Sequence, residues 1–344
     1  MEITNLSKVL TRPCYLVKMT NAKVTILVDP LVDLSSLQSY LPFTLVPSGR
    51  IAKLPFGANG ETFIRQLEDR TYVDGTPEVK IAPLHAIRMQ DVDAILVSHH
   101  TSLLALPFYT EGTGFQGVVY ASEPTVQLGK LVAEEFMEYL ERCSADMADA
   151  EWKDPQRWKN FVNQPTSDPR EWRPFYSQKQ LLSALQRIVH VSFRQSVIAT
   201  EHESVAYLSH TSTRQAHTNE AQLDHLRKMD HLVLTTMCTD RDNIPSERVL
   251  DIGAVVVETL KKGGSVLMPM TPTGTIYDMF EILSSNMDQV STRGADRTCM
   301  KSASIMMNTL MGDQTCLETP EYVSDGTVIA LRGREAPAPY SNRK

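Results

Sequence analysis

Short runs of apolar residues, separated by turns, recur along most of the chain. Many are rich in Val, Ile and Tyr, which favours β-strands. The runs lie at 14–19, 24–29, 94–98, 117–120, 188–194, 204–209 and 232–237. Those in the first third of the chain predict strands of one sheet.

A helix is predicted directly after the strand at 117–120. Ser122 is a suitable N-cap, Glu123 and Pro124 favour a first helical turn, and we expect the helix to end near Arg142. Apolar residues recur within it at spacings of three and four, which predicts one face packed on the sheet. These residues are Leu128, Leu131, Val132, Phe136, Tyr139 and Leu140.

A second helix is predicted between Ser246, as its cap, and Gly263. It follows the strand predicted at 232–237, and the apolar phrase SVLMPM after it predicts a buried strand. The order strand, helix, strand predicts a βαβ unit.

Two stretches lack this periodicity. Residues 144–178 contain Trp152, Trp158, Trp172 and several prolines, which predicts an irregular excursion on the surface. Residues 291–344 are polar or proline-bearing, so we expect a poorly ordered tail.

Composition narrows the class of protein. The chain has 344 residues, and none of its apolar runs is long enough for a membrane span. The net charge of -7 disfavours direct binding to a nucleic-acid backbone, which requires a basic face. The first residues lack the pattern of a secretory signal, and the five widely spaced cysteines fit neither a disulfide framework nor a metal knuckle. We therefore expect an intracellular protein with reduced thiols.

A polar cluster follows the strand at 94–98, in the phrase AILVSHHTSLLALP. Ligand sites gather at strand ends of α/β sheets, so His99 and His100 are candidates. Strand-end histidines satisfied by hydrogen bonds are the simpler interpretation, and Asp29 has a local one as a turn-capping carboxylate. A nucleophilic pair of Ser98 and His99 is disfavoured, because neighbours on a strand point to opposite faces.

The same phrase resembles the second motif of metallo-β-lactamase-fold hydrolases, in which His-x-His-x-Asp-His binds two metal ions that activate a water. Thr101 stands where the second histidine belongs, and the loop to Pro107 is too short to supply the remaining Asp and His. Asp29 matches the aspartate of the first motif. His210 stands where a bridging aspartate is expected.

Longer phrases resemble the non-catalytic members of the metallo-β-lactamase/β-CASP family that occur in the Integrator complex. They are LTRPCYLVKM, TILVDPLVD, SYLPFTLVPSGRIAKLP, ALPFYTEGTGFQGVVYASEPTVQLGKLVAEEFMEYLER and GGSVLMPMTPTGTIYDMFEIL. The similarity spans about Leu10 to Leu283, apart from a gap at 194–203, and ends near Gln289. A truncated or divergent member is therefore expected.

The resemblance implies a fold and its boundaries. The fold is α/β, a metallo-β-lactamase-like αββα sandwich over residues 1–265, interrupted by the excursion at 144–178. The start of a β-CASP domain at 266–290 and a divergent tail at 291–344 follow. The resemblance also implies no catalytic, cofactor-binding or metal-binding residue, since Asp29, His99 and His210 are the remains of a former metal site. No cofactor is expected.

The resemblance further implies a nuclear scaffold subunit of the Integrator complex. Its partners would be the endonuclease subunit, which cuts small nuclear RNA 3′ ends, and other Integrator subunits, with RNA reached only indirectly and no membrane. Two alternatives stay open: a metal-dependent RNA hydrolase with a rearranged site, and a protein without function. Zinc content separates the scaffold from the hydrolase.

Overall fold

The fold comes from a computed structural model in which the chain divides into two compact units. Unit 1 comprises Met1–Ser209 and Leu223–Thr236, and unit 2 comprises His210–Gln222 and Met237–Lys344. The structure describes residues 1–7, 13–20, 22–41, 64–67, 70–82, 87–142, 151–158, 167–192, 204–208, 226–227, 229–235, 245–270, 279, 281–283, 305–307 and 327–332.

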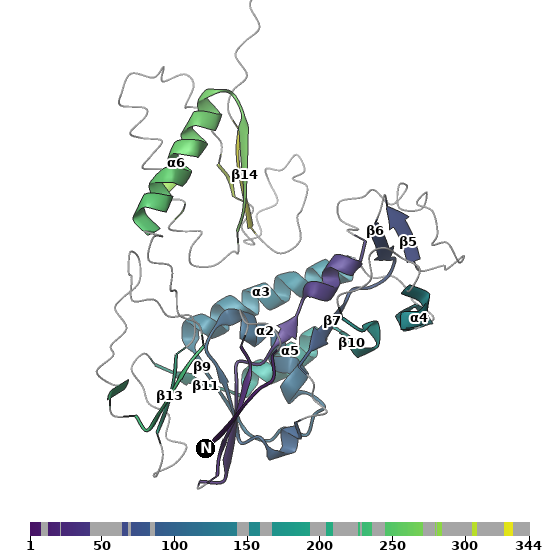
Figure 1. Ribbon diagram of the computed structural model, residues 1–344, viewed down its shortest axis with the longest axis vertical. Coiled ribbons are helices and arrows are strands. Elements are labelled where there is room, and N and C mark those ends of the chain that lie inside the picture. Colours follow the sequence, from purple (N-terminus) through teal and green to yellow (C-terminus); the bar gives the residue numbers. More distant parts are fainter. Residues whose placement is uncertain are drawn as a thin grey trace, which may run out of the picture. The chain divides into compact units, whose positions relative to one another are not determined.

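A six-stranded sheet forms the centre of unit 1 (Figure 1). Its strands, in spatial order, are β1 (Glu2–Asn5), β2 (Tyr15–Met19), β3 (Val24–Val28), β8 (Ala94–Val97), β9 (Val118–Ser122) and β11 (Ile188–Val191). The first three run antiparallel, and β3, β8, β9 and β11 run parallel. The strands predicted in this part of the chain are confirmed.

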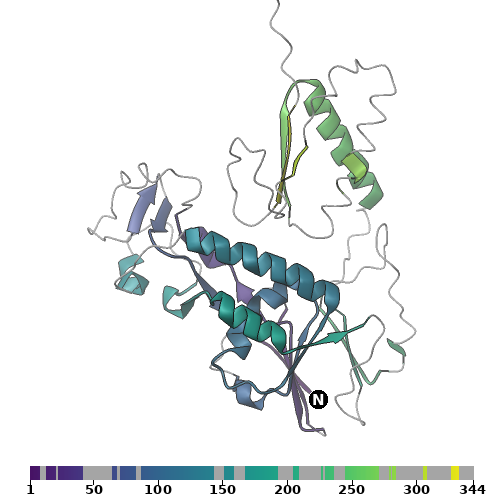
Figure 2. The ribbon, with the colours of Figure 1, turned by 180° about the vertical axis from the view of Figure 1, so that it is seen from behind.

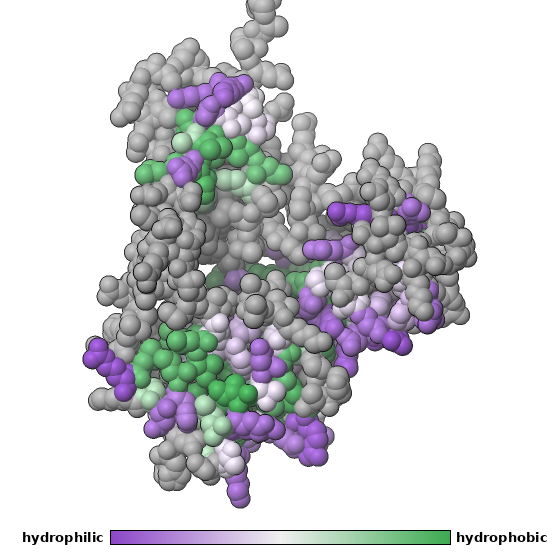
Figure 3. Space-filling model, viewed as in Figure 1, coloured by the Kyte–Doolittle hydropathy of each residue, from purple (hydrophilic) through white to green (hydrophobic). Residues whose placement is uncertain are grey.

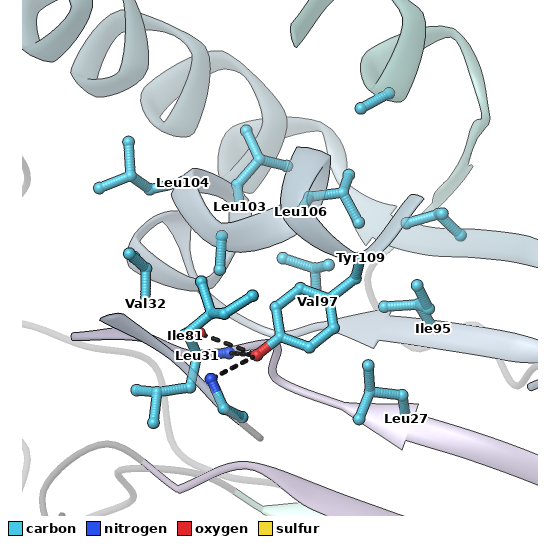
Figure 4. Packing of buried hydrophobic residues seen from close by; sticks show 14 of the residues in the cluster. Leu27, Leu31, Val32, Ile81, Ile95, Val97, Leu103, Leu104, Leu106 and Tyr109 are labelled. Atoms are coloured by element: carbon cyan, nitrogen blue, oxygen red, sulfur yellow. Dashed lines mark hydrogen bonds between the residues drawn. The ribbon is translucent and has the colours of Figure 1, made fainter. Parts of the chain in front are cut away.

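Three helices cover one face of this sheet (Figures 1 and 2). They are α2 (His100–Thr110), α3 (Glu123–Arg142) and α5 (Gln178–Gln186). Their apolar side chains and the facing strand residues form the largest described core. Within it the Tyr109 hydroxyl donates to the Leu31 carbonyl at 2.8 Å and accepts from the N–H groups of Leu31 and Ala82 (Figure 4). One buried phenol therefore satisfies the backbone groups of two segments that are distant in the sequence, at Leu31 and at Ala82.

Helix α3 has the predicted length, with Ser122 at its cap: the Thr125 N–H donates to the Ser122 hydroxyl oxygen at 3.5 Å. Its predicted buried face is wrong at Leu131, which is 49% exposed. The packed line instead runs through Gly129, Ala133 and further residues toward the C-terminal end. At Gly129 this line approaches Leu103 of α2 closely, so the face of α3 that contains Gly129 is the one packed on α2.

A second, two-stranded sheet packs on the other face. Strands β12 (Val205–Leu208) and β13 (His231–Leu234) run parallel, as expected from two further apolar runs. Side chains of β12 pack against a buried cluster on β2 and β3. On the face of the two-stranded sheet that does not contact the central sheet, Leu232 and Leu234 are each 46% exposed. Figure 3 shows hydrophobic atoms gathered over this two-stranded sheet.

The three tryptophans of the excursion are buried, so the prediction of a surface excursion is wrong for them. Trp152, Trp158 and Trp172 pack with Tyr40 and with Ile64 and Val73 in a separate cluster. The short elements around it are β4 (Val32–Asp33), η1 (Ser35–Ser39), β5 (Ile64–Leu67), β6 (Arg70–Val73), β7 (Glu78–Ile81), η4 (Glu151–Lys153), α4 (Pro155–Trp158), η5 (Pro169–Glu171) and β10 (Trp172–Pro174). A 3-10 turn, η3 (Met89–Asp91), precedes β8. The three indole rings are buried together because aromatic surface is costly to leave in water.

Unit 2 contains α6 (Pro245–Lys261) and a three-stranded sheet. Strand β14 (Ser265–Met270) pairs antiparallel with β16 (Thr327–Arg332), which also pairs with β15 (Ile305–Met307). The predicted βαβ unit is therefore wrong, because β13 and β14 belong to different sheets. The helix begins at Pro245, so Ser246 lies inside it.

Strand β14 is less buried than predicted, since Leu267 is 62% exposed. Strands β15 and β16 lie within residues 291–344, where the sequence shows little periodicity. The domain boundaries at 265 and 290 stay predictions. None of the described helices combines the length and apolarity that crossing a bilayer requires.

Candidate functional site

Asp29 lies directly after β3, at the edge of the central sheet where β8 also ends. It is fully buried, its backbone φ is +51°, and its N–H donates to the Leu96 carbonyl at 2.8 Å. Asp tolerates this left-handed conformation better than most residues, and Pro30 disfavours the right-handed helical alternative. The backbone thus turns the carboxylate toward β8.

Three donors hydrogen-bond to the Asp29 carboxylate, and a histidine nitrogen lies close to it. Its Oδ1 accepts from the Ser98 N–H at 2.8 Å and lies 3.5 Å from His99 Nδ1. Its Oδ2 accepts from the Ser98 hydroxyl at 2.7 Å and from the Tyr207 hydroxyl at 2.5 Å. A carboxylate has roughly four lone-pair directions, so these hydrogen bonds take up most of its acceptor capacity. The interpretation of Asp29 as a local turn cap is wrong, because its partners lie 69 and 178 residues away in the sequence.

His99 is the N-cap residue of α2, and both of its ring nitrogens have partners. Nδ1 lies 3.0 Å from the Ser98 hydroxyl, and Nε2 lies 3.2 Å from the Ser102 hydroxyl. Because the Ser98 hydroxyl donates to Asp29, its oxygen can accept from His99 Nδ1, while the Ser102 hydroxyl can donate to Nε2 or accept from it. The expected interpretation of His99 as a hydrogen-bonded strand-end histidine agrees with these contacts.

Ser98 and His99 do not point to opposite faces, contrary to the sequence argument. Strand β8 ends at Val97, and beyond it the Ser98 hydroxyl lies 3.0 Å from His99 Nδ1, so the two side chains meet. The Ser98 hydroxyl nevertheless donates to a carboxylate and not to the histidine, which is the wrong direction for an activated nucleophile. The geometry therefore does not support a serine nucleophile at this position.

The segment after His99 is the helix α2, and not a compressed loop as the sequence suggested. His100 is its first residue, and partial burial lowers the pKa of the His100 imidazole. Ser102 is in the first turn and is 4% exposed. In this turn of α2, Ser102 thus contacts His99, and His100 is partly exposed.

Two neighbouring groups respond to the buried charge. Burial, together with the negative charge of Asp29, raises the pKa of the Cys14 thiol to about 12. Burial and the same carboxylate also raise the pKa of the Tyr207 phenol well above its usual range. Both groups therefore stay protonated at neutral pH. Cys14 is a free, buried thiol, as expected, and the other four cysteines lie outside the described residues.

The bonding around these residues does not fit a pair of metal ions. Three protein hydrogen bonds occupy the Asp29 carboxylate, and His99 Nε2 lies 3.2 Å from the Ser102 hydroxyl. Among the described residues, no three His, Cys, Asp or Glu side chains gather closely enough to bind a metal ion. His210, the third position of the expected former site, lies outside the described residues.

Sequence reasoning missed Tyr207 and Ser102. Alternation within the run SVAYLS places Val205 and Tyr207 on one face of a strand, so the packing of that face against another sheet was predictable. Its partner was not, because nothing local links it to a carboxylate 178 residues earlier. Ser102 follows a histidine by three residues, a spacing that brings side chains together only once helix α2 is known.

Comparison with known proteins identifies the relatives of this chain. No family model matches it. Integrator complex subunit 9 from Xenopus laevis is 32% identical over 322 residues, which cover 84% of this chain and 48% of that protein. The chain is a homologue of Integrator complex subunit 9. Subunit 9 from Homo sapiens is 31% identical with the same coverage, and the Nematostella vectensis homolog is 26% identical over 80% of this chain and 47% of its own length.

The subunit 9 homologues belong to the metallo-β-lactamase/β-CASP family, and the described sheets and helices have the α/β fold class expected for it. The chain spans about half the length of the curated relatives it matches. These relatives are named as subunits of a complex and not as catalytic enzymes.

Proposed function

We propose that this chain is a non-catalytic scaffold subunit of the nuclear Integrator complex, supporting small nuclear RNA 3′-end processing by an endonuclease partner. The bonding of Asp29 is the observation that carries this proposal. Its carboxylate accepts from Ser98 and Tyr207 at the strand end where the related hydrolases are expected to hold metal ions. A carboxylate whose lone pairs are mostly taken up by protein donors is a poor metal ligand, so a water activated by two metals would have no site.

The proposal includes the site residues and the domain boundaries. Asp29, His99 and His210 are the remains of a metal site, with no residue acting in catalysis or cofactor binding. Residues 1–265 form the metallo-β-lactamase-like domain, 266–290 begin a β-CASP domain, and 291–344 are a divergent tail. Similarity to subunit 9 homologues over most of the chain supports both statements.

Co-purification tests the scaffold role. The full chain, tagged and expressed at matched levels, is recovered from nuclear extract and probed for Integrator subunits, including the endonuclease. A Leu103→Asp variant is the control, because a charge in a fully buried core position unfolds the surface that a partner would recognise. We expect recovery with the wild type alone. Equal recovery with both chains, or with neither, contradicts the proposal.

Zinc content and RNA cleavage test the absence of catalysis. We expect less than one zinc per chain after dialysis and no cleavage of RNA above the buffer rate with zinc or manganese present. An Asp29→Ala variant should leave both results unchanged. Stoichiometric zinc, or metal-dependent cleavage that Asp29→Ala abolishes, would instead establish the hydrolase alternative.

A further inference from the structure

The two sheets of unit 1 meet beside Asp29. Val17, Met19, Ile26 and Val28 form a buried cluster on β2 and β3, and Val205 and Tyr207 of β12 pack against it. Alternate residues of β12 thus face the larger sheet, as a strand dictates. This apolar contact by itself sets neither the register nor the position of β12, because aliphatic contacts are non-directional.

Tyr207 adds a directional bond to this contact. Its ring packs edge-on to Tyr15 with centroids 6.5 Å apart, and its hydroxyl donates to Asp29 Oδ2 at 2.5 Å. The acceptor is a fully buried carboxylate. Hydrogen bonds to charged groups contribute about 1.5–3 kcal/mol, and leaving such an acceptor unpaired costs more.

The backbone conformation of Asp29 also indicates that the surrounding residues hold it in place. A non-glycine residue at φ +51° persists when the surroundings hold it there. Here the Ser98 N–H and hydroxyl fix the carboxylate from the central sheet, and Tyr207 holds it from the second sheet. The strained residue is therefore the junction of three chain segments.

We propose that Asp29 and Tyr207 form a lock that holds the β12–β13 sheet against the β2–β3 face. Hydrogen bonds to one buried carboxylate then join the strand ends, in place of the metal ions expected in a catalytic relative. This inference rests on the proposed non-catalytic function, and it assigns Tyr207 a positioning role. The lock keeps the former site closed without a metal.

Hydrogen exchange of the full chain tests the lock. Tyr207→Phe removes the hydroxyl and keeps the ring, and Tyr15→Phe is the matched control in the same aromatic pair. We expect amides of Val205–Leu208 and His231–Leu234 to exchange about tenfold or more faster in Tyr207→Phe, the factor that corresponds to the loss of a charge-assisted bond. Tyr15→Phe should stay within about twofold of the wild type. Equal rates in the two variants would overturn the lock.

A double-mutant cycle identifies the acceptor. Asp29→Asn keeps the left-handed backbone accessible and removes the charge. In this background, Tyr207→Phe should change the exchange rate by less than about half as much as it does in the wild-type chain. Full additivity would show that the hydroxyl acts through another group, and would refute the lock. If Asp29→Asn does not fold, the Tyr207→Phe and Tyr15→Phe pair still decides the question.

The outcomes separate the lock from the proposed function. Unchanged exchange in Tyr207→Phe, with Integrator subunits recovered and no RNA cleavage by the wild type, refutes the lock and leaves the scaffold role standing. The opposite outcome is faster exchange in Tyr207→Phe together with metal-dependent cleavage by the wild type. It supports the lock as a structural contact and refutes the proposed non-catalytic role.

Discussion

At the residue level, Asp29 shows how hydrogen bonds hold a buried carboxylate, with His99 Nδ1 at 3.5 Å from its Oδ1. A carboxylate in a protein interior is costly unless hydrogen bonds replace its hydration. Ser98 supplies two donors from one residue, and Tyr207 supplies a third. The arrangement shows how donors from two distant segments stabilise an acid at the end of a buried strand.

The thiol beside this charge gives a pH-dependent prediction. The pKa of Cys14 is raised from 9.0 to about 12, so the folded chain keeps the proton that the unfolded chain releases. The stabilisation is fully present below pH 9 and is lost as the pH rises from 9 toward 12. We expect the free energy of unfolding to fall by about 1 kcal/mol more in the wild type than in Cys14→Ala between pH 9 and 10.

Urea unfolding at half-unit pH steps checks this prediction. Tyrosines with raised pKa also lose stabilisation above pH 10, but they do so in both chains, and the difference isolates the thiol. Parallel pH profiles for the two chains would show that Cys14 titrates alike in the folded and unfolded states.

Tyr109 gives a second prediction at this scale. Tyr109→Phe leaves the Leu31 and Ala82 N–H groups and the Leu31 carbonyl without their shared partner in the core. We expect a loss of about 2–3 kcal/mol in the free energy of unfolding. Tyr120→Phe, on the partly exposed face of β9, is the control and should change it by less than about 0.5 kcal/mol. Similar losses in both variants would contradict the role given to the Tyr109 hydroxyl.

At the level of elements, α3 and α2 approach at Gly129. A Cβ at this position would lie 2.4 Å from Leu103 Cδ2 and 2.7 Å from Leu103 Cβ. In an exposed helix, replacing Gly with Ala stabilises by about 1 kcal/mol. Here the sign reverses, because Leu103 is fully buried and cannot move away.

We therefore expect Gly129→Ala to destabilise the chain by about 1–3 kcal/mol in urea unfolding. Leu103→Ala on α2 removes the side chain that the added methyl group would meet. The double variant should therefore lose less free energy of unfolding than the sum of the two single variants. A stabilising effect of Gly129→Ala alone would show that the helices do not pack at this point.

Strands and helices followed from the sequence where a local pattern specifies them. The runs that form β2, β3 and β8 and the cap of α3 are local signals, and they were predicted correctly. The face of α3, the tryptophan cluster and the pairing of β14 depend on contacts between distant segments, and the predictions failed there. The candidate site divides in the same way: Asp29 and His99 were found by motif, and Tyr207 was missed because its contact spans 178 residues.

At the level of the whole molecule, the described hydrophobic clusters follow the two units. The three clusters that contain the central sheet, the tryptophans and the β12 contact belong to unit 1, and the cluster of Val256, Met279 and Leu283 belongs to unit 2. Burial of apolar surface is the main source of stability, so each unit has its own source.

We expect a fragment of residues 1–236 to fold by itself. All three tryptophans lie in unit 1, and the Trp158 indole N–H donates to the Trp152 carbonyl at 2.8 Å inside their cluster. Since the fluorescence of both chains reports the same cluster, the emission maximum of the folded fragment should match that of the full chain. Its urea transition should stay cooperative. Its free energy of unfolding should differ from that of unit 1 in the full chain by less than about 1 kcal/mol, because no described cluster of unit 1 loses a member. A Leu103→Asp version of the fragment is the unfolded control. A red-shifted emission and a broad transition in the unmutated fragment, like those of this control, would show that residues beyond 236 are required for unit 1 to fold.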